Sequence, residues 1–339
     1  MQKKLIALAV AGLVSAPVMA QSNVTVYGIV DAYVGYGKQG DNKKLVVNGG
    51  GLSGSRLGFK GTEDLGNGLK AVFTLEYSLN NDVNEGVGTG GLRARQQFVG
   101  LQGGFGFIGL GRQYSPGFGV YKYDSSMGTG WSPQSIFSSQ SGSTITPNSP
   151  ARVSNSINWK SNNMGGLTVN AIYGLGEKNE VDERREGDFA AVGVDYDNGP
   201  LNVGVIIHHI NNGAADNKKE WLLGGGYDFG AVKLLGSYQQ KKIGGLNDKI
   251  IQIGVNVPVG TTSAVQANIA KFDADAGSDF DANAFSVSYT HSLSKRTTAY
   301  AAYTLVDNKD GANFSSFVAS KDAAGDKGHG LGVGIRHVF

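Results

Sequence analysis

The sequence predicts an all-β fold, a closed barrel of sixteen antiparallel strands, from three observations. In segment after segment, apolar and polar residues alternate with a period of two, which is typical of strands with one apolar and one polar face. Glycine is frequent, with 53 residues, and proline is scarce, with 7, a composition that suits many tight turns and few interrupted strands. The connections between the segments are alternately short and long.

The first twenty residues are typical of a signal peptide. Lys3 and Lys4 form a charged start, residues 5–14 form an apolar stretch, and Ala20 ends a small-residue cleavage site. The apolar stretch is too short to span a bilayer, and a buried N-terminal helix is the alternative. Because no repeat or linker divides the remainder, residues 21–339 are expected to form one barrel domain.

Charge and cysteine content exclude several classes of protein. Removing Lys3 and Lys4 leaves 28 basic residues against 28 acidic ones, a neutral balance that argues against a nucleic-acid partner. The chain has no cysteine, which excludes disulfides and thiolate zinc sites. After the signal peptide no apolar run reaches eighteen residues, so the remaining classes are a soluble β protein and an outer-membrane barrel.

The order of segments and connections favours the transmembrane barrel. About sixteen segments alternate, with short turns on one side and longer, more charged loops on the other, as in outer-membrane barrels. An even strand count places both termini on the periplasmic, short-turn side. The segments begin near residues 23, 50, 68, 92, 105, 151, 165, 187, 200, 219, 231, 247, 261, 281, 295 and 327.

The alternation also assigns side chains to the two faces of the wall, because one face must meet lipid and the other water. The residues expected to face outward are Leu57, Phe73, Ile157, Trp159, Val255 and Phe285. Those expected to face the lumen are Arg56, Lys60, Glu76, Arg152 and Lys160.

The segments 93–102 and 105–112 are the exception, because neither face is clearly apolar. Gly100, Gly109 and Gly111 are small residues in these strands. Two interpretations stay open. One face packs against another subunit and the long loop, or the register of these strands is misread.

Between Arg112 and Arg152 lies a connection of a different kind, at about residues 113–151. It has no sustained alternation, and a structureless connection of this length is usually functional or disordered. We expect this third long loop to fold into the lumen and narrow a pore. Its aromatic residues either line a path for solutes or pin the loop to the wall; they are Tyr114, Phe118, Tyr121, Tyr123 and Trp131.

Several stretches resemble the general porins of betaproteobacteria. They are residues 21–31, 55–70, 98–101, 110–112 and 334–339, and the resemblance extends over the whole chain after the signal peptide. It implies an outer-membrane homotrimer of sixteen-stranded barrels whose third long loop forms the constriction. It also implies that the terminal Phe339 is recognised by the barrel-assembly machinery, and that lipid and lipopolysaccharide surround the barrel.

The same resemblance implies which residues form the pore constriction. Arg56, Arg95 and Arg152 match an arginine cluster on the wall, and Glu76 matches a wall carboxylate. Arg112 sits at the base of the loop. The chain departs from the family in having Asp124 as the loop's only acidic residue.

The function expected from these features is passive diffusion of small hydrophilic solutes and ions, with a modest preference for anions. Fixed charges in a narrow pore attract the opposite ion. No catalytic, metal-binding or cofactor motif is present, so no enzyme activity or cofactor is expected. Three alternatives stay open: arginines that only brace the loop, a solute-selective channel with a binding site at the constriction, and a non-conducting structural or adhesin barrel.

Overall fold

The computed structural model describes residues 23–83, 93–178, 185–213, 215–319 and 321–339. The predicted signal peptide, residues 1–20, lies outside the described residues. Among the described residues, no helix has the length and hydropathy needed to cross a membrane.

Strands make up most of the chain. They are β1 (Asn23–Gln39), β2 (Asn42–Gly49), β3 (Arg56–Gly66), β4 (Leu69–Ser78), β5 (Arg93–Gly103), β6 (Gly106–Tyr114), β7 (Arg152–Lys160), β8 (Leu167–Gly174), β9 (Phe189–Asn198), β10 (Leu201–Ile210), β11 (Lys218–Asp228), β12 (Lys233–Ile243), β13 (Leu246–Val259), β14 (Ser263–Asp273), β15 (Ala282–Ser292), β16 (Thr297–Asn308) and β17 (Gly328–Val338). The helices are η1 (Pro116–Tyr123), α2 (Pro133–Gln140), η2 (Ser149–Ala151) and η3 (Ser278–Phe280).

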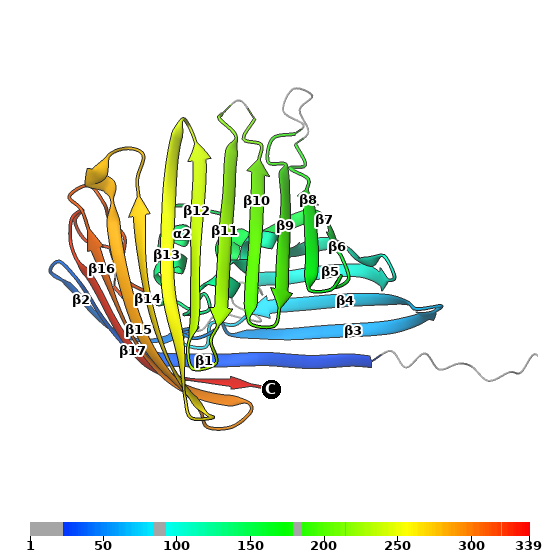
Figure 1. Ribbon diagram of the computed structural model, residues 1–339, viewed down its shortest axis with the longest axis horizontal. Helices are drawn as coiled ribbons and strands as arrows, with labels where there is room; N and C mark the ends of the chain where they lie inside the picture. Colours follow the sequence, from blue (N-terminus) through cyan, green and yellow to red (C-terminus); the bar gives the residue numbers. More distant parts are fainter. Residues whose placement is uncertain (1–22, 84–92, 179–184, 214, 320) are drawn as a thin grey trace, which may run out of the picture.

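The sheet closes on itself between the two ends of the chain (Figure 1). β1 pairs with β17 from Ile29 opposite Val338 onward, and the amide and carbonyl of Phe339 bond to those of Gly28 at 3.1 Å each. β2 and β3 share the other edge of β1, with β2 along its second half and β3 along its first. Because these two segments occupy one position, the barrel has sixteen positions, and the predicted closed barrel is confirmed.

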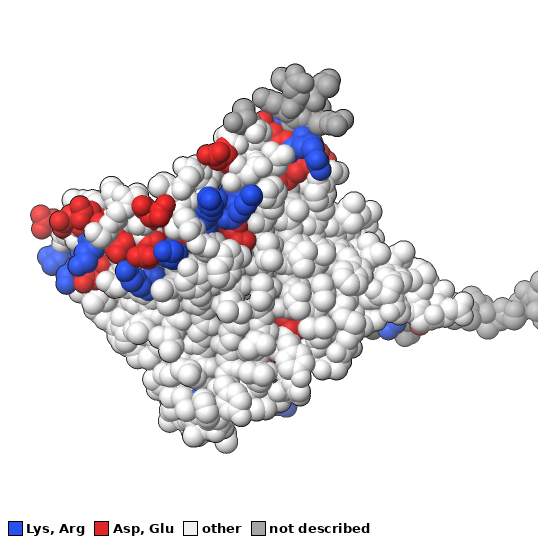
Figure 2. All heavy atoms as spheres, turned by 45° about the horizontal axis from the view of Figure 1, so that its top comes forward, with Lys and Arg blue, Asp and Glu red and all other residues white. Residues whose placement is uncertain are grey.

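The two faces of the wall are distinguished by solvent exposure. In β10, Val203, Val205 and Ile207 are exposed while the alternating positions are buried. Figure 2 shows charged residues gathered along one rim, with a wall below that is nearly free of charge. Among the residues expected outward, Ile157, Trp159 and Phe285 are exposed; Leu57, Phe73 and Val255 are partly buried.

β5 and β6 have an apolar outward face after all. Val99, Leu101, Ile108 and Leu110 are exposed and lie opposite one another in the register. The alternation is hard to see in the sequence because glycines occupy inward positions of both strands.

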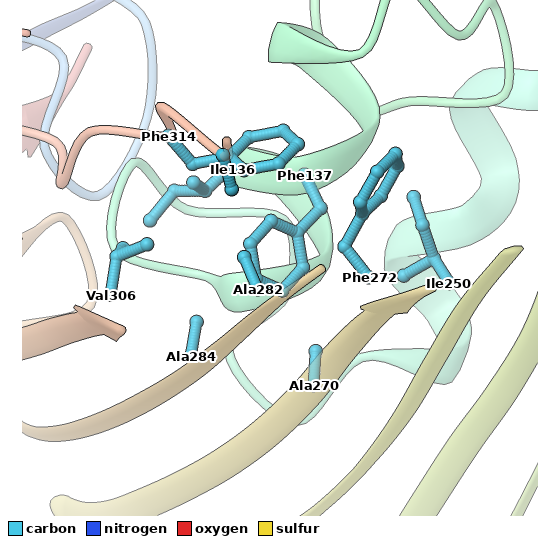
Figure 3. Packing of buried hydrophobic residues seen from close by; sticks show 10 residues of the cluster. Ile136, Phe137, Ile250, Ala270, Phe272, Ala282, Ala284, Val306 and Phe314 are labelled. Carbon is cyan, nitrogen blue, oxygen red and sulfur yellow. The ribbon is translucent and has the colours of Figure 1, made fainter. Parts of the chain in front are cut away.

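The buried core lies inside the barrel. The helices of the 113–151 segment pack on wall residues that are buried and alternate with exposed ones. Figure 3 shows Ile136 and Phe137 of α2 against Phe272 of β14 and Phe314 of the last long loop. The ring centroids of Phe137 and Phe314 are 5.0 Å apart. The predicted loop therefore lies on the inner face of the wall.

Candidate functional site

The 113–151 loop is fixed to one side of the barrel by buried polar groups. Glu220 of β11 accepts hydrogen bonds from the amides of Thr144 and Ile145, at 2.9 and 3.1 Å, and from the Thr144 hydroxyl at 2.5 Å. His208, opposite Glu220 on β10, bonds the same hydroxyl at 2.8 Å. This anchor was not predicted from the sequence, because its only signal is an inward carboxylate and its partners are backbone amides of an irregular loop.

Asp124 differs from its predicted role in the pore constriction. Its side chain accepts hydrogen bonds from the amides of Ser126 and Gly128 at 2.9 Å, from the Ser132 hydroxyl at 2.6 Å and from the Asn268 amide at 2.5 Å. It is only 1% exposed. Burial raises the pKa of this carboxyl, and the hydrogen bonds oppose that shift. Asp124 therefore braces the loop instead of presenting its charge to the open lumen.

Tyr123 pins the loop to the wall through a slot made by two glycines. Its hydroxyl donates to Asp195, and its ring is fully buried. A Cβ added to Gly224 would lie 2.2 Å from Tyr123 Cγ, and one added to Gly204 would lie 1.9 Å from the Tyr123 hydroxyl. These strand positions must stay without a side chain for Tyr123 to dock.

We predict that Gly224→Ala displaces Tyr123 and loosens the loop, because overpacking of this kind costs about 1–3 kcal/mol. The measurement is single-channel current, which should become noisier than in the unaltered protein. Gly225→Ala is the matched control, since a Cβ there meets only ordinary contacts at 3.4 Å and beyond. Equal current noise in the Gly224→Ala and Gly225→Ala variants would contradict the role of Gly224 in docking Tyr123.

The aromatic residues of the loop divide between the two expected roles. Tyr123 and Trp131 are buried and pin the loop, and Trp131 packs on Tyr300 of β16 with ring centroids 5.3 Å apart. Phe118 and Tyr121 line the cavity that faces the opposite wall. The structure therefore assigns the pinning role to Tyr123 and Trp131, while a path for solutes along Phe118 and Tyr121 stays a prediction.

Three of the predicted arginines, Arg56, Arg95 and Arg152, come together on the part of the wall that faces the loop. They lie on β3, on β5 and at the start of β7. Arg95 Nε lies 2.7 Å from Glu76 Oε1, and Arg56 Nη1 lies 3.9 Å from the same oxygen. The Tyr114 hydroxyl accepts hydrogen bonds from Arg95 at 3.0 Å and from Arg152 at 3.3 Å. One carboxylate thus joins two guanidinium groups, and one tyrosine joins the third.

A β-bulge brings Arg95 to this position. In the body of β5, odd-numbered residues such as Val99 and Leu101 face outward, so simple alternation would aim Arg95 at lipid. The register with β4 shifts after Gln96 pairs with Glu76, so that Ala94 pairs with Tyr77 and Arg95 is the extra residue. Such a bulge re-aims side chains. The alternation of apolar and polar residues in the sequence does not reveal this bulge.

The arginines and the loop face each other across a cavity of about 520 Å³. Its wall side includes Arg56, Arg93, Arg95 and Arg152; its loop side runs from Phe118 to Ser149. Within the described part of the chain, no aspartate or glutamate lines it. Arg93 was not predicted; its inward direction depends on the same bulge.

Arg112, predicted to belong to the pore constriction at the base of the loop, lies apart from the three clustered arginines. Arg112 lies opposite Gln97, in phase with the exposed Leu110. Its Nε donates to the Ala94 carbonyl at 3.2 Å and its Nη1 to the Ser154 hydroxyl at 2.8 Å. It is absent from the described lining of the cavity.

Lys60 and Lys160 line a second cavity, of about 580 Å³, nearer the short-turn end. Lys60 lies beside Thr25 in the register of β1 and β3, and Lys160 beside Phe107 in that of β6 and β7. The predicted inward direction of both lysines agrees with this placement.

We predict that Glu76→Gln increases the preference for chloride over potassium. The change removes the carboxylate charge that joins Arg56 and Arg95. A unit charge ~8 Å away in water changes the free energy of each ion by about 0.5 kcal/mol, with opposite signs for chloride and potassium. Salt screening over roughly 8 Å reduces the combined effect to about a twofold change in the permeability ratio. The ratio is measured from the zero-current potential in a KCl gradient, and a decrease would contradict the prediction.

Comparison with known proteins agrees with this architecture. Residues 7–311 match the family model described as Gram-negative porin. The chain belongs to the Gram-negative porin family. Outer membrane porin protein 32 of Delftia acidovorans is 36% identical over the full length of both chains. The family predicted from the sequence is confirmed, and with it an outer-membrane location and a channel in place of an enzyme.

Two solved outer-membrane proteins show the same fold. The anion-selective porin from Comamonas acidovorans is 32% identical, with a TM-score of 0.83 over 94% of this chain and 100% of that one. OmpT of Vibrio cholerae in its trimer form is 15% identical, with a TM-score of 0.67 over 94% and 99%. The second likeness concerns the fold alone.

Proposed function

We propose that this porin lets small hydrophilic solutes and ions diffuse passively, with a modest preference for anions. The observation that carries the preference is the cavity between wall and loop, lined by four arginines and, among the described residues, by no carboxylate. The similarity to a solved porin described as anion-selective supports it. Neither energy nor a cofactor is needed.

The mechanism follows from where the charge lies. Guanidinium groups on one wall lower the free energy of an anion in the narrow passage and raise that of a cation. Water and salt screen the effect over roughly 8 Å at physiological ionic strength. Glu76 neutralises part of the cluster, so the selectivity is a few-fold at most.

In this proposal the loop at residues 113–151 acts as the constriction. It is attached to β9–β16 through Tyr123, Glu220 and their partners, and it leaves open space toward β3–β7. Irregular backbone at membrane depth is tolerated where protein or lumen water satisfies its polar groups. The loop sets the size limit, and the arginines set the ion preference.

We also propose a homotrimer in contact with lipid and lipopolysaccharide, exported through the signal peptide at residues 1–20. Phe339 would serve as the assembly signal: it directly follows β17, the strand that closes the barrel, and it is 44% exposed. The molecular mass of the native complex in detergent tests the trimer. A monomeric mass would contradict it.

Stepwise current in a planar bilayer tests the channel itself. The purified protein should give discrete, ohmic current steps in KCl. A barrel that inserts without conducting would support the non-conducting alternative and refute the proposal.

A further inference from the structure

The second cavity has a chemistry that ion conduction alone does not require. Among the described residues, its lining comes from the wall strands β1 and β3–β7 and includes no residue of the 113–151 loop. Phe98 and Phe107 lie on its surface between Lys60 and Lys160. Apolar rings that face a water-filled lumen gain free energy when a solute covers them and removes their surface from water.

The two rings form a preorganised aromatic surface. Their centroids are 5.6 Å apart at an interplanar angle of 74°, the edge-to-face arrangement that aromatic pairs prefer. Gly100 and Gly109 make room for the Phe107 ring, because a Cβ on either would lie 2.7 or 2.4 Å from a ring carbon. The absence of side chains at Gly100 and Gly109 therefore lets the Phe107 ring lie against the wall.

The two lysines supply positive charge on either side of the aromatic surface. Among the described residues, neither ammonium group has a carboxylate within ion-pair distance. Lys60 Nζ lies 5.3 Å from the centroid of Tyr27, a cation–π contact that leaves its charge available. The remaining lining includes hydroxyl and amide side chains, from Thr25, Thr62, Thr74 and Gln102.

We infer that this cavity is a binding site for small aromatic monocarboxylates. The ring of such a solute would stack on Phe98 and Phe107, and its carboxylate would pair with Lys60 or Lys160. The volume of about 580 Å³ is within the range of about 300–1,000 Å³ that is usual for small-molecule sites. The inference rests on the proposed anion channel and adds a solute class to it.

The test is the effect of benzoate and acetate on chloride current through the full-length protein in planar bilayers. Benzoate should reduce the current at a concentration at least about fivefold lower than acetate, as expected from one or two aromatic contacts. The variant Phe98→Leu/Phe107→Leu should lose this difference. Phe105→Leu should keep it, because Phe105 lies in the turn between β5 and β6, is 45% exposed and is not among the lining residues.

A second variant keeps the inference testable if the aromatic substitutions disturb folding. Lys60→Gln/Lys160→Gln removes the charges of the site and should weaken block by benzoate while the channel still conducts. Equal block by the two anions in the unaltered protein would overturn the inference, as would full benzoate block in both double variants. Chloride preference measured without benzoate reports separately on the proposed anion channel.

Discussion

Excision of residues 129–146 is expected to raise the single-channel conductance at least about twofold, because a sixteen-stranded barrel without its inner loop encloses a wide aqueous lumen. The segment contains α2 and the two loop residues that donate hydrogen bonds to Glu220, so about half of the loop leaves with it. The chain can be rejoined by a short glycine linker, since a Cβ on Gly128 would lie 2.6 Å from Pro147 Cβ.

The control for this deletion is a truncation of the last long loop, for example at residues 321–326, which lie outside the described lining of the arginine cavity. It should leave the conductance largely unchanged. If the excision variant inserts and conducts at the level of the unaltered protein, the 113–151 loop is not the constriction.

The triple variant Arg56→Gln/Arg95→Gln/Arg152→Gln is expected to lose the preference for anions. The permeability ratio of chloride to potassium should fall at least about threefold, because the variant removes three positive charges from the same narrow part of the pore. Arg93 remains in the cavity wall and offsets Glu76, so the ratio should fall toward one. The measurement is the zero-current potential in a KCl gradient.

Arg112→Gln is the matched control for the arginines, because it removes the same charge from a position that does not line the cavity. It should shift the zero-current potential by much less than any of the other three substitutions. A shift as large as that of Arg56→Gln would mean that total charge, and not placement, sets the selectivity.

Sequence periodicity was sufficient for most of the barrel wall, with β5 and β6 as the exception. The alternation that put Ile157 outward and Glu76 inward reflects a hard constraint, since each strand has lipid on one side and the lumen on the other. The closing pair of β1 and β17 followed from the even strand count. The helices inside the 113–151 segment could not be predicted in this way, because tertiary contacts and not periodicity determine them.

The arrangement of the site could be predicted only in part. Arg56, Arg95 and Arg152 were grouped by resemblance to a family, while alternation alone would have sent Arg95 outward across an unrecognised bulge. Asp124 and Glu220 show the other limit. Whether a carboxylate faces the pore or binds loop amides depends on neighbours distant in sequence, such as Asn268 and Thr144, which only the folded barrel brings near.

The most direct test of the proposed pore is the zero-current potential of the unaltered protein across a KCl gradient, recorded at low and at high mean salt. Because arginines line the passage opposite the loop, the sign should be that of chloride selectivity, and the potential should decrease as salt screens the cluster. A potential of the opposite sign, showing that potassium is preferred, would contradict the assignment of the arginine wall as the selectivity site.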